Sequence, residues 1–403
     1  MAYSKSNGRL PLSGLNVIDL TRLLPGPLCT MMLGDYGAEI VKVEDVDAGD
    51  PTRFVGSLFE GSGSFFRQLN RNKKSLALNL KTAEGREIIR NLAVKADVLV
   101  EGFRPGVMDR LGLGYEEISK VNNRLVYAAI SGYGQEGPYR ERAGHDINYT
   151  AIAGLLDLSA ANSGSPIMPA VQIADIAGGS LMALSGIMFA LFERQQSGKG
   201  SFVDISMNRG LLPWLTYAAS TIGSDEKIPR RGSGYITGAY ACYNIYETAD
   251  GKQMSLGALE PVFWQRFCET VGKTQWTPLQ FEQERQAELI KGVELIFKEK
   301  SRQQWEELFA KVDACCEPVL NMEEAINHPV SLTGNYWLNA PCGEGKTEIM
   351  TGFPLLFTGS PGELRLAPPR HGEHTMEILQ SIGYDHETIT GLIGRGIIKT
   401  GSR

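Results

Sequence analysis

The chain has 403 residues, 42% of them hydrophobic and 21% charged, which are ordinary values for a globular protein that buries a core. This length predicts about two to three domains. The net charge of -6 argues against nucleic acid as the main partner.

The sequence also bears on location. Residues 1–9 are polar and include no apolar segment, so we expect no secretory signal. The apolar stretch 176–192 contains Gly and Ser and predicts a buried helix, because a membrane span needs about 20 apolar residues. The six cysteines have no C-x-x-C spacing, which indicates free thiols in a reducing compartment. We therefore expect a cytoplasmic protein without a membrane partner.

Strand-like and helix-like segments alternate over the first two hundred residues. Pro25 suits the first turn of a helix and Gly37 suits its end. The alternation predicts an α/β domain with a mostly parallel sheet flanked by helices. The expected strands are 15–20, 39–44, 75–80, 97–100, 125–130 and 202–206, and the expected helices are 28–36, 82–94 and 180–192.

The second half of the chain has a different pattern. Residues 239–257 predict a strand–turn–strand with Ala249-Asp250-Gly251 at the turn. Charged helices are expected at 260–272 and 282–312, which together indicate a smaller α+β domain. We expect a large domain beginning at 1–215, a small domain at 216–329, and a C-terminal segment, 330–403, that returns to the large domain.

His145 and Asp175 are candidates for proton transfer. His145 lies in the polar segment Gly144–Thr150, at a loop-to-helix transition, and an imidazole has an intrinsic pKa of about 6.5. Asp175 lies where the long helix is expected to begin, and a helix N-terminus stabilises an anion. Each residue also has a purely structural interpretation, because histidine and aspartate can simply cap a helix. The residues alone leave both interpretations open.

Three other motifs have alternatives. Gly132–Gly137 matches the dinucleotide pattern G-x-G-x-x-G, but proline and charged residues follow, so a loop around something small is favoured. The basic cluster 70–74, with Lys42 and Arg104 near strand ends, suits either phosphate binding or a solvated surface. The spacing in 371–374 (His-Gly-Glu-His) is too loose for a metal site, so a surface loop is predicted.

Several longer motifs occur together in the order typical of one superfamily. They are Pro25–Pro27, Asn72–Leu76, Phe103–Val107, Ser131–Gln135, Gly198–Gly200 and Gly372–Thr375. On these motifs the chain resembles the family III CoA-transferase superfamily, and within it the alpha-methylacyl-CoA racemases, from Leu12 to near Thr390. The resemblance implies a large Rossmann-like domain and a small domain in an interlocked homodimer, with the active site between subunits.

The resemblance also implies roles for individual residues. His145 matches the racemase acid/base, and Asp175 matches the catalytic aspartate of both racemases and transferases. Asp146 and Glu260 are expected to orient and polarise this pair. At Asp45 the chain departs from the racemases, which place there an arginine that holds a CoA phosphate. The expected CoA-binding residues are Lys42, Arg71, Lys73, Lys74, Leu78, Asn79, Leu80, Lys81, Arg104, Gly144 and Tyr149.

The leading functional hypothesis is a racemase or epimerase of 2-methylacyl-CoA thioesters, in which His145 and Asp175 exchange the α-proton through an enolate. The thioester is the substrate, and no metal or other cofactor is expected. The alternative is a CoA-transferase, in which Asp175 attacks the thioester and forms a mixed anhydride and then an aspartyl-CoA thioester. A third hypothesis is a catalytically silent protein that binds acyl-CoA.

Overall fold

The computed structural model describes residues 9–59, 61–159, 164–225, 228, 230–343 and 345–401. The first eight residues lie outside this set. The prediction that residues 1–9 carry no secretory signal therefore falls mostly outside the described residues. The chain forms two compact units. The first comprises residues 1–153, 171–213 and 330–403, and the second comprises 154–170 and 214–329.

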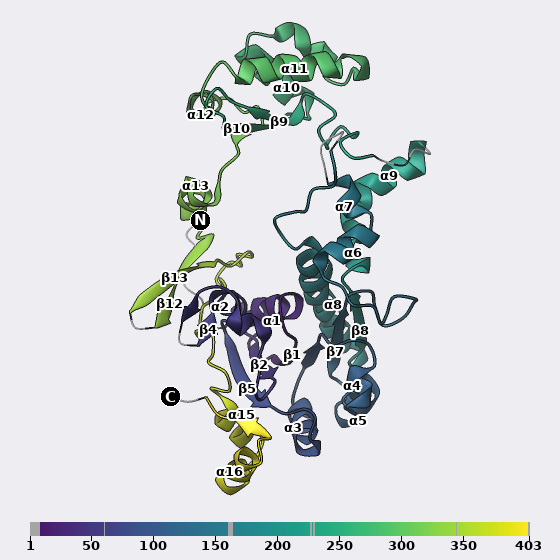
Figure 1. Cartoon of the computed structure of the whole chain (residues 1–403), viewed down its shortest axis with the longest axis vertical. Coiled ribbons are helices and arrows are strands. Elements are labelled where there is room, and N and C mark those ends of the chain that lie inside the picture. Colours follow the sequence, from purple (N-terminus) through teal and green to yellow (C-terminus); the bar gives the residue numbers. More distant parts are fainter. Residues whose placement is uncertain are drawn as a thin grey trace. The chain divides into compact units, whose positions relative to one another are not determined.

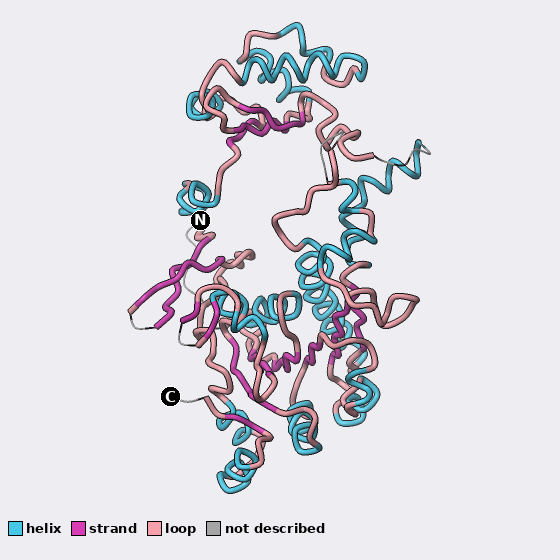
Figure 2. The backbone as a smooth tube through the Cα atoms, viewed as in Figure 1, coloured by secondary structure: helices cyan, strands magenta, loops and turns pink. Residues whose placement is uncertain are grey.

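The first unit is built on a seven-stranded sheet with the strand order β14-β5-β2-β1-β6-β7-β8, visible as the long run of strands in Figure 2. Neighbouring strands are parallel except at one edge, where β14 runs antiparallel to β5. The expected mostly parallel sheet is confirmed. Its strands are β1 (Asn16–Leu20), β2 (Glu39–Glu44), β5 (Lys73–Leu78), β6 (Val98–Glu101), β7 (Val126–Ser131), β8 (Phe202–Ser206) and β14 (Ile398–Lys399).

Helices cover both faces of this sheet (Figure 1). One face shares a hydrophobic core with α3, α5, α15 and α16. The other face packs against α1 and α8. All six residues of β7 are buried, as expected for a strand covered on both sides. The helices are α1 (Pro25–Asp35), α3 (Ala83–Ala93), α4 (Val107–Arg110), α5 (Tyr115–Val121), α6 (Asp146–Ile152), α8 (Met182–Ser197), α15 (Thr375–Ser381) and α16 (His386–Gly394), with the π-helix η2 (Ala174–Leu181) directly before α8.

Smaller elements complete the first unit. The 3-10 helix η1 and α2 follow β2, and two short hairpins, β3–β4 and β12–β13, were not expected from the sequence. Together, η2 and α8 form one helix, Ala174–Ser197, that is long and apolar enough to cross a membrane, although 44% of its most apolar window is buried inside the protein. These elements are η1 (Pro51–Phe54), α2 (Ser64–Leu69), β3 (Leu58–Phe59), β4 (Ser62–Gly63), β12 (Trp337–Gly343), β13 (Lys346–Thr351), η3 (Arg209–Leu215) and α14 (Pro329–Thr333).

The motif 371–374 docks the C-terminal segment onto the sheet. The backbone N–H of Gly372 donates to Ser75 Oγ (2.8 Å), and that of His374 donates to the Ser75 carbonyl (3.0 Å). His371 Nε2 lies 2.9 Å from the carbonyl oxygen of Asp45. Gly372 has φ +70°, and a Cβ there would lie 2.6 Å from the Lys399 carbonyl. These contacts show that the motif contributes to packing. The described ranges contain no group of three His, Cys, Asp or Glu side chains arranged to hold a metal.

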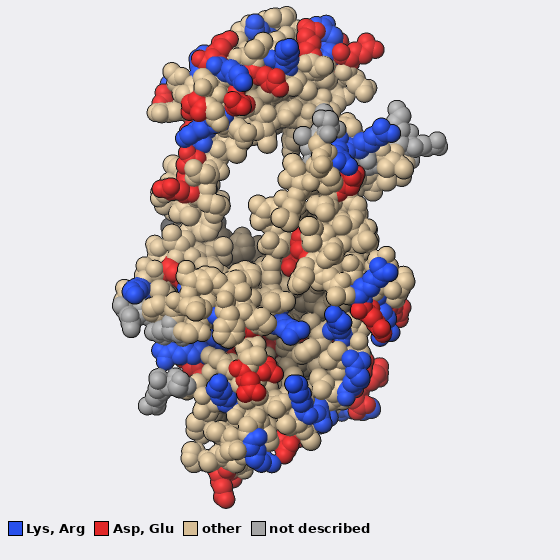
Figure 3. All heavy atoms as spheres, in the orientation of Figure 1, with Lys and Arg blue, Asp and Glu red and all other residues tan. Residues whose placement is uncertain are grey.

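The second unit has a three-stranded antiparallel sheet, β11-β10-β9, packed on helices around a core rich in stacked aromatic rings. The expected helix 282–312 breaks at Ser301, whose side chain caps a new helix. Over these helices, blue and red spheres are interspersed in Figure 3. The elements are α7 (Leu155–Leu158), α9 (Thr216–Asp225), β9 (Tyr243–Glu247), β10 (Gln253–Gly257), α10 (Pro261–Thr270), η4 (Thr274–Leu279), η5 (Gln283–Arg285), α11 (Gln286–Phe297), α12 (Arg302–Phe309), β11 (Cys316–Pro318) and α13 (Met322–Asn327).

Candidate active site

A pocket of about 300 Å³ lies at the carboxyl ends of the central strands of the first unit. After β1 the chain adds strands on one side, β2 and β5, and then crosses to β6 on the other side. Such a reversal of strand order leaves a crevice beyond the carboxyl ends of the strands, where open α/β sheets bind ligands. The pocket is lined by residues that follow β1, β2, β5 and β6, among them Arg22, Asp45, Leu80 and Phe103.

Three of the predicted CoA-binding residues, Leu78, Leu80 and Lys81, line this pocket. Asn79 lies between them and uses its side-chain oxygen to accept the backbone N–H of Lys81 (3.0 Å). The carboxylate of Asp45 accepts the N–H groups of Asp47 and Ala48 and so closes its own turn. The segment 78–81 therefore forms part of a cavity large enough for a portion of a small-molecule ligand.

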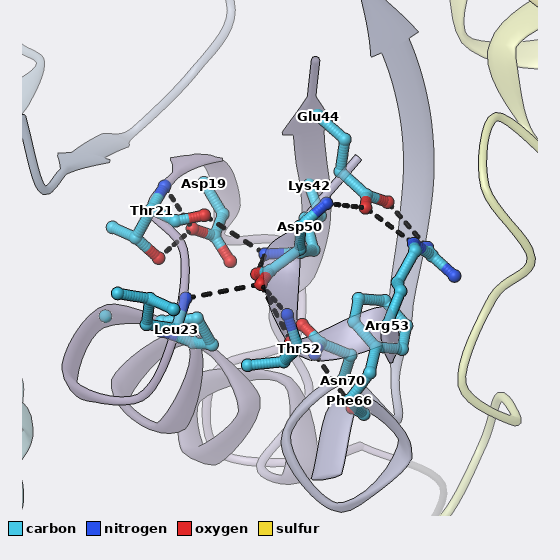
Figure 4. A network of polar contacts seen from close by, with 12 residues as sticks. Asp19, Thr21, Leu23, Lys42, Glu44, Asp50, Thr52, Arg53, Phe66 and Asn70 are labelled. Atoms are coloured by element: carbon cyan, nitrogen blue, oxygen red, sulfur yellow. Dashed lines mark hydrogen bonds and ion pairs between the residues drawn. The ribbon is translucent and has the colours of Figure 1, made fainter. Parts of the chain in front are cut away.

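A network of buried ion pairs lies beside the pocket (Figure 4). Lys42 pairs with Asp50 (2.9 Å), and Arg53 makes two 2.7 Å contacts to Glu44. Burial alone would raise the pKa of Glu44, but Arg53, Lys42 and Ser75 outweigh it and lower the pKa to about 2. In this network each buried carboxylate is stabilised in its ionised form by a neighbouring cation.

The same pairing occupies most of the predicted phosphate-binding cations. Lys73 is buried and bonds Asp19 (3.0 Å), and burial at Asp19 is outweighed by Lys73 and Lys42, which hold the pKa of Asp19 well below its usual range. Arg71 is buried in a two-bond contact with Asp35. Lys42, Arg71 and Lys73 thus each have a carboxylate partner within the protein. That any of them also contacts CoA stays a prediction.

The two remaining predicted cations differ from these. Arg104 is exposed in the loop after β6. Burial, with Asp175 and Tyr133, raises the pKa of Tyr149 to about 12, and the charge of Arg104 opposes this shift in part. Lys74 pairs with Glu377 of α15 (2.7 Å) and lines a second cavity of about 350 Å³, together with residues at the start of β1 and β2. The structure thus places Arg104 within electrostatic reach of Tyr149 and Lys74 at a different cavity.

His145 is the exposed residue that precedes α6. The Asn148 side chain accepts the backbone N–H of His145 (3.0 Å), which closes the first turn of the helix. Asp146, the first helical residue, is half-buried and accepts the backbone N–H of Asp175 with its Oδ1 (3.0 Å). Residues 29 positions apart are joined by this bond, so the two predicted proton-transfer segments lie side by side.

Asp175 lies in the first turn of η2, which is π-helical over Ala174–Leu181. Single π turns inside longer helices are frequent at functional sites. The start of the helix at this point is confirmed. The glycines that follow lie close to neighbouring residues: a Cβ on Gly178 would lie 2.2 Å from the Met207 carbonyl, and one on Gly179 would lie 2.8 Å from Pro25. They allow η2 to pack against neighbouring backbone.

The pKa of Asp175 is raised to about 6. Burial is the largest cause, the negative charge of Asp146 adds to it, and His145 opposes it. The half-buried carboxylates of Asp146 and Asp175 thus lie near the imidazole of His145. Neither lysine nor arginine is among the groups that act on Asp175, in contrast to the buried ion pairs beside the pocket. A carboxylate with such a pKa can both accept and return a proton near neutral pH.

Gly132 and Gly144 enclose the ring of Tyr149. A Cβ on Gly132 would lie 2.5 Å from that ring, and one on Gly144 would lie 2.7 Å from it. The Tyr149 hydroxyl donates to the Gly144 carbonyl (2.5 Å), and the ring meets Tyr133 edge-on at 5.1 Å between centroids. The Tyr149 ring therefore fills the space beside Gly132, and the expectation that the glycines of 132–137 shape a loop around something small stays a prediction.

Two further carboxylates differ in whether the sequence indicated them: Glu260 was predicted to act at the site, and Glu101 was not. Glu260 precedes α10 in the second unit, so its action on His145 stays a prediction. Glu101, at the end of β6, was not singled out. It accepts the backbone N–H of Phe103 (2.7 Å), and burial, with a smaller effect of Asp109, raises its pKa to about 8. Its only sequence signal is its position just before the motif Phe103–Val107.

The comparisons with known proteins cover almost the whole chain. The profile described as CoA-transferase family III matches residues 12–375. The chain is 35% identical to the alpha-methylacyl-CoA racemase of Homo sapiens, over 97% of this chain and 98% of the relative. It is 32% identical to the succinyl-CoA:glutarate CoA-transferase of Homo sapiens, over 98% and 91%.

A solved structure agrees with the same assignment. A CAIB/BAIF family protein from Brucella suis superposes with a TM-score of 0.81 at 28% identity, and the match covers 93% of this chain and 100% of the other. The resemblance seen in the motifs is confirmed. The chain belongs to the CoA-transferase family III.

Proposed function

We propose that this protein is a racemase or epimerase of 2-methylacyl-CoA thioesters. The observation that carries the proposal is the grouping of His145 and Asp146 with Asp175, whose pKa is raised to about 6. The alignment with a racemase at 35% identity supports the same reaction. The family is shared with transferases, so the chemistry of this site has to distinguish the two.

In the proposed reaction the thioester acidifies the α-hydrogen at C2. One member of the pair, His145 or Asp175, removes this proton and leaves a planar enolate. The other member, in its protonated form, delivers a proton to the opposite face of C2, which inverts the configuration. Backbone N–H groups near the glycines of this site stabilise the charge that develops on the thioester oxygen.

The roles of the surrounding residues follow from their contacts. Asp146 holds the backbone of Asp175 and, through its charge, keeps the Asp175 pKa high. Lys81 lines the pocket and Arg104 acts on Tyr149; both side chains are exposed, and we assign them to the CoA phosphates. We expect no metal and no cofactor other than the CoA thioester itself.

We further propose that the large unit is a Rossmann-like CoA-binding domain and that the chain works as an interlocked homodimer. Several large apolar side chains of the first unit are exposed, which suits burial against a second copy. They include Phe189 and Phe192 of α8 and Leu212 of η3. We expect Glu260 to complete the site in that assembly.

The second candidate is a CoA-transferase. Asp175 would attack the thioester carbonyl, release CoA as the thiolate and form a mixed anhydride. The CoA thiolate would then attack the Asp175 carbonyl, which gives the aspartyl-CoA thioester and releases the donor carboxylate. The acceptor carboxylate would form a second anhydride with Asp175, from which CoA takes the acceptor acyl group and leaves Asp175 free. The half-buried carboxylate of Asp175 and the 32% identity to a glutarate CoA-transferase favour this candidate. His145 would then only help to position Asp175.

One incubation separates the two candidates. The protein is mixed with (R)-2-methylacyl-CoA in D₂O, with and without glutarate or succinate as acceptor acid. The racemase proposal expects deuterium at C2 and formation of the (S) thioester without any acceptor. Transfer of CoA to the acceptor with no deuterium at C2 would contradict the racemase proposal and support the CoA-transferase. The Asp175→Asn variant controls for background exchange in both arms.

A further inference from the structure

The two proposed proton-transfer residues sit on different elements, and their spacing needs a support. His145 directly precedes α6 and Asp146 is its first residue, whereas Asp175 belongs to η2. The hydrogen bond from Asp175 N–H to Asp146 is one direct link between them. Reacting groups must be held in place tightly, because a misplacement of about 1 Å can cost a factor of about 100 in rate.

The turn after β8, Met207–Gly210, contacts the α6 side of the site. The Asn208 side chain donates its Nδ2–H to the backbone carbonyl of Tyr149 (2.8 Å), in the middle of α6. The backbone N–H of Asn208 donates to the Gly132 carbonyl (3.0 Å). Because Gly132 and Tyr149 also pack on each other, Asn208 fixes α6 and the loop that encloses its tyrosine at the same time.

The same turn contacts the η2 side. A Cβ on Gly178 would lie 2.2 Å from the Met207 carbonyl, and one on Gly210 would lie 2.3 Å from the Gly178 carbonyl. The η2 backbone therefore rests directly on the backbone of the turn, three residues after Asp175. The turn is itself tied to the sheet, since Met207 N–H donates to the Ser131 carbonyl at the end of β7 (2.9 Å).

We propose that the turn Met207–Gly210 is a clamp that sets the distance between the His145–Asp146 and Asp175 segments, and that Asn208 is its positioning residue. Asn208 acts through Tyr149 and makes no contact with the reacting atoms. The inference rests on the proposed function, in which these two segments carry the two proton-transfer groups. It adds a residue that none of the sequence motifs indicated.

The pKa of Asp175 reports on the clamp, and a purely structural role of Asn208 would leave this pKa unchanged. Asp146 raises the pKa of Asp175 because it is close, so a looser α6 lets that pKa fall. His145, which lowers it, begins the same helix. The other titratable groups on the elements packed against η2 are Tyr149 of α6, Cys29 and Asp35 of α1, Asp204 of β8, and Glu193 and Arg194 of α8.

The causes of the shift at Asp175 are burial, Asp146 and His145, whereas the charge of Asp175 acts on Tyr149, whose own pKa is raised. Three of the other groups are held by partners of their own. Asp35 bonds Arg71, Asp204 accepts the Gln135 N–H (3.1 Å), and Arg194 bonds Asp97 (2.9 Å). A change in the Asp175 pKa on loosening the clamp would therefore report on the distance between η2 and the start of α6.

The test compares Asn208→Ala with Asn122→Ala in the full-length protein. Asn122 is a matched control, because its side chain also donates to backbone carbonyls, those of Ala93 and Ala96 (both 2.9 Å), at the opposite end of the sheet. The Asp175 carboxyl is titrated by NMR with ¹³C-labelled aspartate, and its signal is assigned from Asp175→Asn. This arm needs no enzymatic activity, so it tests the clamp even if the proposed reaction is wrong.

We expect the Asp175 pKa to fall by roughly one unit in Asn208→Ala and to stay at its wild-type value in Asn122→Ala. The kcat for C2 exchange should drop about 10- to 100-fold in Asn208→Ala, with KM little changed, because binding contacts are kept. An unchanged pKa and kcat in folded Asn208→Ala would overturn the clamp. If that variant does not fold, Asn208→Ser, whose shorter hydroxyl does not reach Tyr149, is judged by the same two results.

Discussion

Two groups of carboxylates in the first unit are held in opposite ways. Asp19, Glu44 and Asp50 are buried beside Lys73, Arg53 and Lys42, and the pKa values of Asp19 and Glu44 are lowered. Asp146 and Asp175 lie next to each other, and the pKa of Asp175 is raised to about 6.

We interpret the first group as charges that build the fold and assign the second group to the proposed chemistry. Asp19 and Glu44, whose pKa values are held low by their cations, stay ionised and take up no proton over the physiological range. A half-buried carboxylate beside another carboxylate is poised to change its protonation state, which is the property of a functional group. Both arrangements lie in the first unit and both involve burial. The neighbouring charge, and not burial alone, therefore distinguishes the two groups of carboxylates.

The largest expected effect is the loss of activity in Asp175→Asn. An amide is neither a base nor a nucleophile, so exchange at C2 and transfer of CoA should both fall by at least about 1000-fold. Turnover is measured with 2-methylacyl-CoA, and CoA binding is measured separately to show that the variant is folded. Near-normal turnover would remove Asp175 from the mechanism and end the comparison drawn above.

His145→Ala should distinguish the two candidate reactions. As one of two proton-transfer groups, its loss should lower racemisation by about 10²- to 10⁴-fold, while exchange of the α-proton from one enantiomer persists. Exchange is followed in D₂O from the (R) and the (S) thioester separately. Equal, undiminished exchange from both enantiomers would contradict the two-base mechanism.

Lys73→Met tests the other side of the comparison. It leaves Asp19 buried without its closest cation, which should lower the free energy of unfolding by about 3–5 kcal/mol. Chemical denaturation measures the change. Lys120→Met is the control, because Lys120 forms an exposed pair with Glu117 and its loss should cost less than about 1 kcal/mol. Equal losses in the two variants would argue against a structural role for the buried network.

Arg104→Ala and Lys81→Ala should each raise the KM for the CoA thioester about 10- to 100-fold, because a charge-assisted contact to phosphate contributes about 1.5–3 kcal/mol. The matching pantetheine thioester lacks the nucleotide phosphates, so its KM should change little. A KM for the full CoA ester that is unchanged in both variants would move the phosphate site elsewhere.

Asp146→Asn should produce the smallest change, a shift in the pH profile. The Asp175 pKa is raised, so its carboxylate binds a proton as the pH falls through about 6 and the rate declines below that pH. Removing the charge of Asp146 lowers this pKa, and the decline should move to lower pH by up to about one unit. The asparagine oxygen still accepts the Asp175 N–H. The measurement is kcat/KM against pH, and an unmoved acidic limb would mean that Asp146 does not act through its charge.

Much of the first unit could be predicted from local patterns. The strands β2 and β8 have the bounds that their apolar runs indicated, and α1 starts and ends at its proline and glycine signals. The break at Ser301 was missed although its capping box is a local signal. The hairpins β3–β4 and β12–β13 were missed because short strands carry little periodicity.

The sequence by itself determined which residues can transfer a proton and which family the chain resembles, because residue chemistry and motif order are written along the chain. Only the tertiary structure decided which charges are matched. Lys73 and Asp19 are 54 positions apart, and Asp146 and Asp175 are 29 apart. It also decided that Gly178 and Gly179 serve packing, and that Asn208 meets Tyr149. A pKa and a close approach depend on neighbours in space, and the sheet brings those neighbours together only when the strands are in register.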